Sequence, residues 1–209
     1  MYKKKFFFIV FDGVEGTGKS FQINKLYNSL KKRKFSVIKT REPGGSQTAE
    51  KIRNLIFNKK SEKFHKLTDF YLMLASRNEH VQNTIKLAKS NRSIVLCDRF
   101  TDSTIAYQVV GNKINSYLNE INMKHIVDKY KPNLTIILKS NIKSISSRIK
   151  KRKVKNKFDK LSTKFYKRAQ NTFLQIAKSK KNYKVFDSSY NNSLLEKEIL
   201  SLVLKKISN

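Results

Sequence analysis

Residues 6–20, FFFIVFDGVEGTGKS, decide the fold of this chain. An apolar run, Phe6–Phe11, ends in Asp12 and is followed by an octet that fits the phosphate-loop pattern G-x-x-x-x-G-K-[ST]. The octet consists of Gly13, Val14, Glu15, Gly16, Thr17, Gly18, Lys19 and Ser20. An amphipathic segment, 19–33, follows directly, so the pattern predicts a strand, a phosphate loop and a helix in that order.

The residue types of the octet suit a nucleoside triphosphate. Its three glycines let the backbone curl so that N–H groups point at phosphate oxygens. Lys19 adds a positive charge near the transferred phosphoryl group, and the Ser20 hydroxyl can ligate Mg²⁺. The helix that begins near Gly18 directs its positive dipole end at the same anion. A glycine-rich turn with no ligand would not explain why Lys and Ser follow the last glycine.

Length and composition favour one soluble domain, residues 1–209. No apolar run approaches the length of a membrane span. Cys97 is the single cysteine and lies inside an apolar segment, so we expect a buried thiol, no disulfide framework and a reducing cytoplasm as the setting. The three histidines are scattered and suggest no metal site.

The formal net charge of +31 has two interpretations. A basic excess can mark a protein that binds nucleic acid. However, the 46 Lys and Arg residues are spread over the whole chain, and the abundance of Lys, Asn, Ile and Phe is what an AT-rich coding sequence would produce. We therefore expect codon drift, with contact to nucleic acid at most non-specific and salt-sensitive.

Apolar runs alternate with helical patterns, which predicts an α/β fold with a mostly parallel five-stranded sheet. The expected strands are Phe6–Phe11, Phe35–Lys39, Ile94–Cys97, Leu134–Leu138 and Tyr183–Phe186. The expected helices are Lys19–Arg33, Ser46–Phe57, Leu67–Lys89, Thr101–Val110, Tyr117–Tyr130, Ile142–Arg152, Leu161–Ala177 and Leu194–Ile207. Ligands of such folds gather at the carboxyl ends of the strands.

Polar motifs follow two of the expected strands. After the second strand, Arg41 precedes a Glu-Pro-Gly-Gly turn, which would hold a guanidinium at the sheet edge; the bond before Pro43 is a candidate cis peptide. After the third strand, Asp98 has the usual position for holding Mg²⁺, and Arg99 would face an acceptor phosphate. These motifs predict a phosphate-rich site at one edge of the sheet.

Two of the expected helices carry candidate ligand contacts. Ser103 and Tyr107, and likewise Thr104 and Gln108, are four residues apart and share a polar face. Arg77 interrupts the apolar stripe of the helix 67–89, and because an unpartnered buried charge is costly, it should line a cleft. Met73 lies one turn before Arg77 on the same side.

Together these motifs resemble the bacterial thymidylate kinase family, P-loop kinases that pass the ATP γ-phosphoryl group to dTMP in dTTP biosynthesis. The resemblance covers roughly residues 6–177, and the REPGG, DRF and DSTIAYQ stretches are its most specific parts. It implies that Glu15 meets the sugar 3′-hydroxyl and that Arg41 and Arg99 hold the monophosphate. It further implies that the thymidine pocket is formed by Arg77 at the base edge with Met73, Ser103, Tyr107 and Gln108, and that Asp98 and Ser20 position Mg²⁺.

The resemblance also implies a mobile lid at 148–160, a homodimer and ATP as co-substrate. Some members of the family carry an arginine inside the phosphate loop, and others have arginines in the lid. This loop contains none, so the resemblance implies that Arg148 and Arg152 of the lid supply catalytic positive charge together with Lys19 and Arg99. Met73 stands where the family often has a phenylalanine, and Lys139 where it commonly has an acidic residue. These two departures bear on substrate affinity and stringency, but they remove no group that phosphoryl transfer needs.

Three other functions remain open from the sequence. Another nucleotide kinase of this fold would lack the combination of REPGG with DRF-x-DS-x-x-AYQ. A basic P-loop ATPase that acts on nucleic acid would turn over ATP without dTMP. An inactive relative would be expected to have lost part of the set formed by Lys19, Ser20, Arg41, Arg77, Asp98 and Arg99, and the chain retains all of them.

Overall fold

Five parallel strands form the centre of the structure, a computed structural model that describes residues 5–58, 64–152, 157–189 and 193–208. The strands are β1 (Phe7–Asp12), β2 (Val37–Arg41), β3 (Ile94–Asp98), β4 (Leu134–Lys139) and β5 (Tyr183–Asp187). Their order in the sheet is β2-β3-β1-β4-β5, with every pair parallel. The predicted α/β class with a parallel sheet is confirmed.

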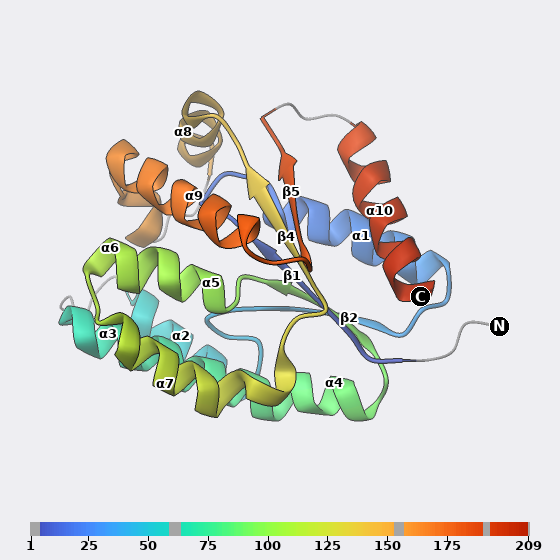
Figure 1. Ribbon diagram of the computed structural model, residues 1–209, viewed down its shortest axis with the longest axis horizontal. Helices are drawn as coiled ribbons and strands as arrows, with labels where there is room; N and C mark the ends of the chain where they lie inside the picture. The colour runs from blue at the N-terminus through green and yellow to red at the C-terminus, as the bar shows by residue number, and fades with distance from the viewer. Residues whose placement is uncertain (1–4, 59–63, 153–156, 190–192, 209) are drawn as a thin grey trace.

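Helices cover both faces of this sheet (Figure 1). The first half of the described chain contributes α1 (Lys19–Lys32), α2 (Gln47–Phe57), α3 (Lys66–His80), the π-helical segment η1 (Val81–Ile85), α4 (Lys86–Ser90), α5 (Thr101–Thr104) and the π-helical segment η2 (Ile105–Val109). The second half contributes α6 (Val110–Asn112), α7 (Ser116–Val127), the 3₁₀ turns η3 (Asp128–Tyr130) and η4 (Lys157–Lys160), α8 (Ile142–Lys150), α9 (Thr163–Lys178) and α10 (Ser193–Ser208).

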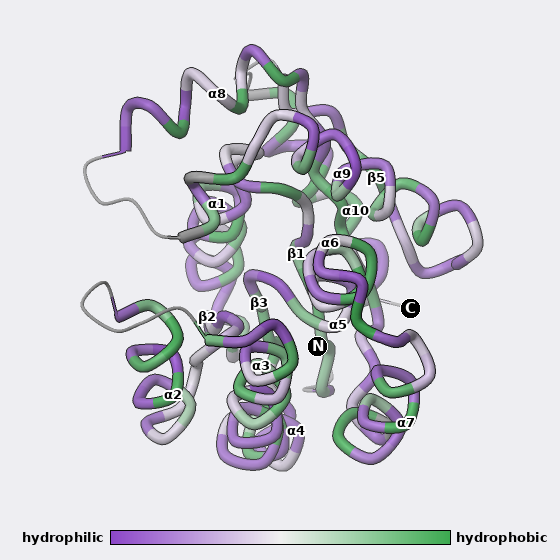
Figure 2. The backbone as a smooth tube through the Cα atoms, turned by 90° about the vertical axis from the view of Figure 1, so that its left-hand side faces the viewer, coloured by the Kyte–Doolittle hydropathy of each residue, from purple (hydrophilic) through white to green (hydrophobic). Residues whose placement is uncertain are grey.

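Alternate residues of β1, the central strand, pack into two different hydrophobic cores on opposite faces of the sheet. Phe7, Ile9 and Phe11 of β1 pack with apolar residues of α1 and α10, whereas Phe8 and Val10 pack with η1, α4 and α7 on the opposite face. Burial on both sides explains why the inner strands β1, β3 and β4 are mostly apolar, as expected for a parallel sheet covered on both faces, whereas the edge strands β2 and β5 carry exposed polar residues. Around the sheet, the helices show alternating hydrophilic and hydrophobic stretches (Figure 2), the pattern of amphipathic helices.

Strand β2 lies two residues further along the chain than the predicted Phe35–Lys39. The apolar run begins at Phe35, but Lys34 adopts a positive φ of 61° and the Phe35 N–H bonds back to the Leu30 carbonyl, so the turn after α1 extends to this point. The shift matters because it pairs Arg41 with Asp98, the last residue of β3.

Two predicted helices contain π turns. The segment 67–89 is helical but passes through η1, and the segment 101–110 passes through η2, which carries Tyr107 and Gln108. The sequence could not predict these turns, since helix prediction assumes a constant period of 3.6 residues. π turns are frequent at functional sites, and η2 lies beside the phosphate loop.

No helix of the residues described here is long and apolar enough to cross a membrane. Of the predicted lid 148–160, residues 153–156 lie outside the described part of the chain.

The buried position of Phe8 in the core predicts a large loss of stability when its ring is removed. Its ring is fully buried and meets the Phe100 ring edge-on at a centroid distance of 5.1 Å. Phe8→Ala should lower the free energy of unfolding by about 3–5 kcal/mol, because it removes apolar contacts and leaves a cavity. Urea denaturation measures this. Leu87→Ala, at a side chain 58% exposed, is the control and should change the same free energy by less than about 1 kcal/mol; equal effects would contradict the assignment of the core.

Candidate active site

Three cavities surround the phosphate loop at the carboxyl edge of the sheet. The inner cavity is lined by Glu15, Glu42, Pro43, Met73, Arg77, Arg99, Phe100, Ser103, Thr104, Tyr107, Gln108 and Phe158. The outer cavity, of about 520 Å³, is lined by Glu15, Gly16, Gly18, Lys19, Ser20, Phe21, Arg41, Glu42, Pro43, Arg53, Phe57, Asp98, Arg99, Arg152 and Phe158. The side cavity, of about 210 Å³, is lined by Thr17, Gly18, Phe21, Gln22, Arg148, Ser188 and Leu195.

The structure brings most of the predicted substrate residues together. All of them except Arg41 line the inner cavity, and Arg41 lines the outer one with Lys19, Ser20, Asp98 and Arg152. The linings of the inner and outer cavities have in common Glu15, Glu42, Pro43, Arg99 and Phe158, so the ion-paired Glu15 and Arg99 belong to a wall that both cavities share. Val14 differs from its neighbours in the loop, because its side chain is fully buried in a core cluster with α8 and α9 and only its backbone serves the loop.

The phosphate loop is held in shape by its own lysine. The Lys19 ammonium donates to the carbonyl oxygens of Gly13 and Val14, at 2.8 Å each. Gly13 has a φ of +132°, and a Cβ there would collide with the Leu138 carbonyl, so the close approach of β4 requires glycine. Burial lowers the pKa of Lys19 to about 8, and the nearby positive charge of Arg99 adds to this effect.

Ser20 and Asp98 meet at the floor of the outer cavity. The Ser20 hydroxyl donates to Asp98 Oδ2 at 2.8 Å, so the oxygens of two residues 78 positions apart converge. Hydroxyl and carboxylate oxygens are the ligands that Mg²⁺ prefers. Over the described residues, no cluster of three His, Cys, Asp or Glu side chains could hold a metal alone. The donor set therefore fits Mg²⁺ that takes its remaining ligands from water and phosphates.

Arg99 joins the phosphate loop to the helix that follows β3. Its guanidinium donates to Glu15 Oε1 at 2.7 Å and to the Gly13 carbonyl and Ser103 Oγ at 3.0 Å each. Burial opposes its charge, but Tyr107 and Glu15 raise the pKa of Arg99 above its ordinary value. The backbone of Arg99 is strained, with a φ of +73° that only surrounding structure can maintain.

Glu15 accepts a second hydrogen bond from the Tyr107 hydroxyl. Burial and the carboxylate of Glu15 raise the pKa of Tyr107 well above its ordinary value, so the hydroxyl remains protonated and donates. The Arg99 guanidinium also lies 5.2 Å from the centre of the Tyr107 ring. Glu15 is thus held by one cation and one hydroxyl at the wall between the two cavities.

Arg77 lies under the inner cavity and is only 3% exposed. Its Nε donates to Glu42 Oε2 at 2.7 Å, Nη1 to Thr104 Oγ1 at 2.9 Å and Nη2 to the Phe100 carbonyl at 3.0 Å. Arg77 lines a cleft, as the break in the apolar stripe predicted, but its charge is already paired with Glu42. That Arg77 also meets a ligand stays a prediction. Met73, one turn earlier on α3, lines the same cavity.

The three remaining arginines of the prediction lie in different places. Arg41 is paired with Glu50 at 2.9 Å in the outer cavity. Arg152 also lines that cavity and forms an ion pair with Asp159 at 2.6 Å. Arg148 instead lines the side cavity and donates to the carbonyls of Gly16 and Ser188, at 3.1 and 2.8 Å. The two lid arginines therefore face different cavities.

Arg53 and Asp12 are among the residues of this site that sequence reasoning missed. Arg53 of α2 lines the outer cavity and donates to the Pro43 carbonyl at 2.6 Å, and no local pattern marks it. Asp12 is fully buried and accepts from the Gly13 N–H at 3.0 Å and from Ser103 Oγ at 2.7 Å, 3.7 Å from Arg99. The sequence signal that could have identified Asp12 is its position as a carboxylate at the end of an apolar strand. Through its contacts, Asp12 orients the side chains of Arg99 and Ser103.

Asp12 makes stability depend on pH. Burial raises its pKa from 3.8 to about 6, although Arg99 partly offsets this. Between pH 3.8 and about 6, the Asp12 carboxyl is protonated in the folded state but ionised in the unfolded chain. Its contribution to the free energy of unfolding is therefore complete below pH 3.8 and is lost as the pH rises through about 6. Asn does not titrate. The free energy of unfolding of the wild type, relative to that of Asp12→Asn, should therefore increase by about 1 kcal/mol when the pH is lowered from 7 to 5.

Urea denaturation of both proteins at the two pH values measures the effect. A difference in unfolding free energy that is the same at both would contradict the buried, proton-holding state of Asp12.

Comparisons with known proteins agree with this geometry. A sequence model described as thymidylate kinase matches residues 11–199. A thymidylate kinase of Sulfurihydrogenibium sp. is 38% identical over 179 residues, 84% of this chain and 85% of that protein. One of Mycoplasma capricolum is 32% identical over 207 residues, 96% and 95% of the two chains. The crystal structure of thymidylate kinase from Ehrlichia chaffeensis superposes with a TM-score of 0.77 at 28% identity, covering 95% of this chain and 99% of that one. With a family match over most of its length and relatives above 30% identity, the chain belongs to the thymidylate kinase family.

Proposed function

We propose that the chain transfers the γ-phosphoryl group of ATP to dTMP, giving dTDP and ADP in dTTP biosynthesis. The observation that carries this proposal is the pair of adjoining cavities whose shared lining includes the ion-paired Glu15 and Arg99. A site for an acceptor phosphate and a site for a donor phosphate must meet in this way for direct transfer, since the reacting atoms have to approach within about 3–3.5 Å.

The acceptor would occupy the inner cavity. Arg99, with Arg41 nearby, would hold its phosphate, Glu15 would accept from the sugar hydroxyl, and Arg77 would donate to a carbonyl at the base edge. Met73, Ser103, Tyr107 and Gln108 complete this pocket. The triphosphate would lie along residues 13–20 in the outer cavity. The side cavity shares Gly18 and Phe21 with the outer one, which supports it as the site for the nucleoside part of ATP, with Arg148 beside it.

The transfer would depend on charge and position. An oxygen of the dTMP phosphate attacks the γ-phosphorus in line, the bond to the β–γ bridging oxygen breaks, and ADP leaves with that oxygen. The attacking group is already an anion, so no strong base is required. Lys19, Arg99 and Arg152 line the cavity in which negative charge develops. Mg²⁺, held by Ser20 and Asp98, would add charge neutralisation on the phosphates.

Three further proposals concern the setting of the enzyme. One kinase domain would span 1–209. A homodimer is supported by large exposed apolar side chains on two helices that contact each other, Leu67 and Tyr71 on α3 and Tyr117 and Ile121 on α7. A cytoplasmic location is supported by the single, buried, free Cys97.

A panel of acceptors tests the activity. ADP release from ATP and Mg²⁺ would be measured with dTMP, dUMP, dCMP, dGMP, AMP or single-stranded DNA as the stimulant. We expect dTMP to stimulate most strongly. Stimulation by DNA with no response to any monophosphate would instead support the nucleic-acid-dependent ATPase that the net charge of +31 left open.

Lys19→Ala tests the donor site. The loss of the ammonium removes positive charge at the transferred phosphoryl group, so turnover should fall by roughly two to four orders of magnitude. Calorimetric dTMP binding is the matched readout and should change by less than about threefold, because Lys19 lines only the outer cavity. Near-normal turnover would remove the ATP site from residues 13–20.

A further inference from the structure

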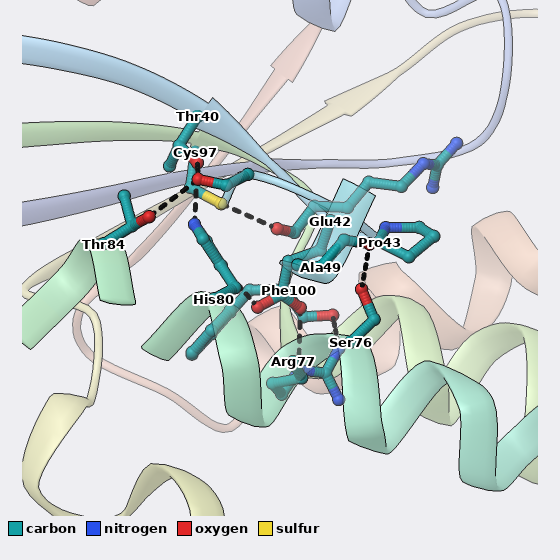
Figure 3. A network of polar contacts seen from close by, with 12 residues as sticks. Thr40, Glu42, Pro43, Ala49, Ser76, Arg77, His80, Thr84, Cys97 and Phe100 are labelled. Carbon is teal, nitrogen blue, oxygen red and sulfur yellow. Dashed lines mark hydrogen bonds and ion pairs between the residues drawn. The ribbon is translucent and has the colours of Figure 1, made fainter. Parts of the chain in front are cut away.

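A buried polar cluster joins the turn after β2 to α3 (Figure 3), and two of its members line the inner cavity. It consists of Thr40, Glu42, Arg77 and His80, which we call the His80 network. Glu42 bridges Arg77 and His80: its Oε2 accepts from Arg77 Nε at 2.7 Å, and its Oε1 lies 2.9 Å from His80 Nδ1. His80 Nε2 is 2.7 Å from Thr40 Oγ1. His80 is fully buried, whereas Glu42 and Arg77 also line the cavity.

The partners of His80 determine which of its nitrogens carries hydrogen. Glu42, paired with the permanent cation of Arg77, is a carboxylate and can only accept. Nδ1 must therefore carry hydrogen and donate to Glu42. Nε2 lies 2.7 Å from Thr40 Oγ1 on the other side of the ring, so each ring nitrogen has a polar partner.

The turn that carries Glu42 is fixed to α3 and η1 on both sides of the His80 ring. Gly44 N–H donates to Ser76 Oγ at 2.9 Å, and Thr84 Oγ1 donates to the Gly45 carbonyl at 2.7 Å. A Cβ at Gly45 would lie 2.6 Å from His80 Cδ2, so glycine there leaves the space that the ring occupies. The imidazole is thus clamped between the turn and the helix.

We propose that His80 is a positioning residue for recognition of the acceptor base. By donating to Glu42 it fixes the carboxylate that sets the plane of the Arg77 guanidinium, and it does so without reaching the cavity itself. A guanidinium only donates hydrogen bonds, so a well-aligned Arg77 favours a pyrimidine with a carbonyl at this edge over one with an amino group. This inference rests on the proposed function, in which Arg77 contacts the base.

Two substitutions at His80 distinguish the effect of losing its hydrogen-bond donor from the effect of changing the volume of its ring. His80→Asn keeps an N–H in place of Nδ1, whereas His80→Phe keeps the ring and loses both nitrogens. Loss of one buried hydrogen bond to a charged group corresponds to about a tenfold change. His80→Phe should therefore raise the KM for dTMP about tenfold and reduce the preference for dTMP over dCMP by a similar factor. The KM for ATP should stay within about twofold, and His80→Asn should restore most of the affinity for dTMP.

Arg77→Ala, measured in parallel, shows whether a failed test concerns the role of His80 alone or the proposed base pocket on which that role depends. If Arg77→Ala raises the KM for dTMP while His80→Phe does not, the role of His80 is overturned and the kinase assignment stands. If Arg77→Ala leaves it unchanged, the base pocket is misplaced and the inference is overturned with it. Equal increases in the two KM values in His80→Phe would indicate a merely structural role and also overturn it.

An NMR measurement on the wild-type protein does not depend on whether the variants fold. The chain has three histidines, so ¹⁵N-labelled imidazoles can be assigned by substituting His65 and His125. We expect Nδ1 of His80 to carry the hydrogen that is donated to Glu42. Hydrogen on Nε2 alone would overturn the proposed network.

Discussion

The ion pair between Arg99 and Glu15 is the interaction on which the rest of the site depends. It links the phosphate loop after β1 to the helix after β3, two neighbouring strands of the sheet. Both side chains are largely buried, and such a pair is stable only when further hydrogen bonds satisfy it. Tyr107 satisfies Glu15, and Asp12 with Ser103 supports Arg99. Removing any of them would leave a buried charge without its full set of partners.

The order of the strands in the sheet brings Arg99 and Glu15 together. β1 lies between β3 and β4, so the phosphate loop emerges beside the end of β3, and β2 on the far side of β3 brings Arg41 level with Asp98. The polar residues at the carboxyl edge are therefore neighbours in space although they are far apart in sequence. The same edge places the turn with Glu42 against α3, where His80 and Arg77 meet it on consecutive turns of one helix face.

Much of this arrangement was predictable from local sequence. The phosphate loop is marked by its glycines and Lys19, and Arg77 is marked by the apolar stripe that it interrupts. The rest depends on contacts between distant segments. Glu42 and His80 are 38 positions apart, and nothing in either local pattern connects them. Arg148 and Arg152 are four residues apart, but α8 ends at Lys150, so the two side chains face different cavities. The π turn at Ile105–Val109 was not predictable from a helical period of 3.6 residues.

The most direct test follows the phosphorus atom itself. ³¹P NMR of wild-type protein with ATP, Mg²⁺ and dTMP distinguishes transfer to an acceptor from hydrolysis, because dTDP and inorganic phosphate give separate signals. A shared wall between two cavities predicts that the γ-phosphoryl group appears as the β-phosphate of dTDP, with little inorganic phosphate. Inorganic phosphate formed at the same rate with and without dTMP would contradict the account, because the inner cavity would then have no role in the reaction.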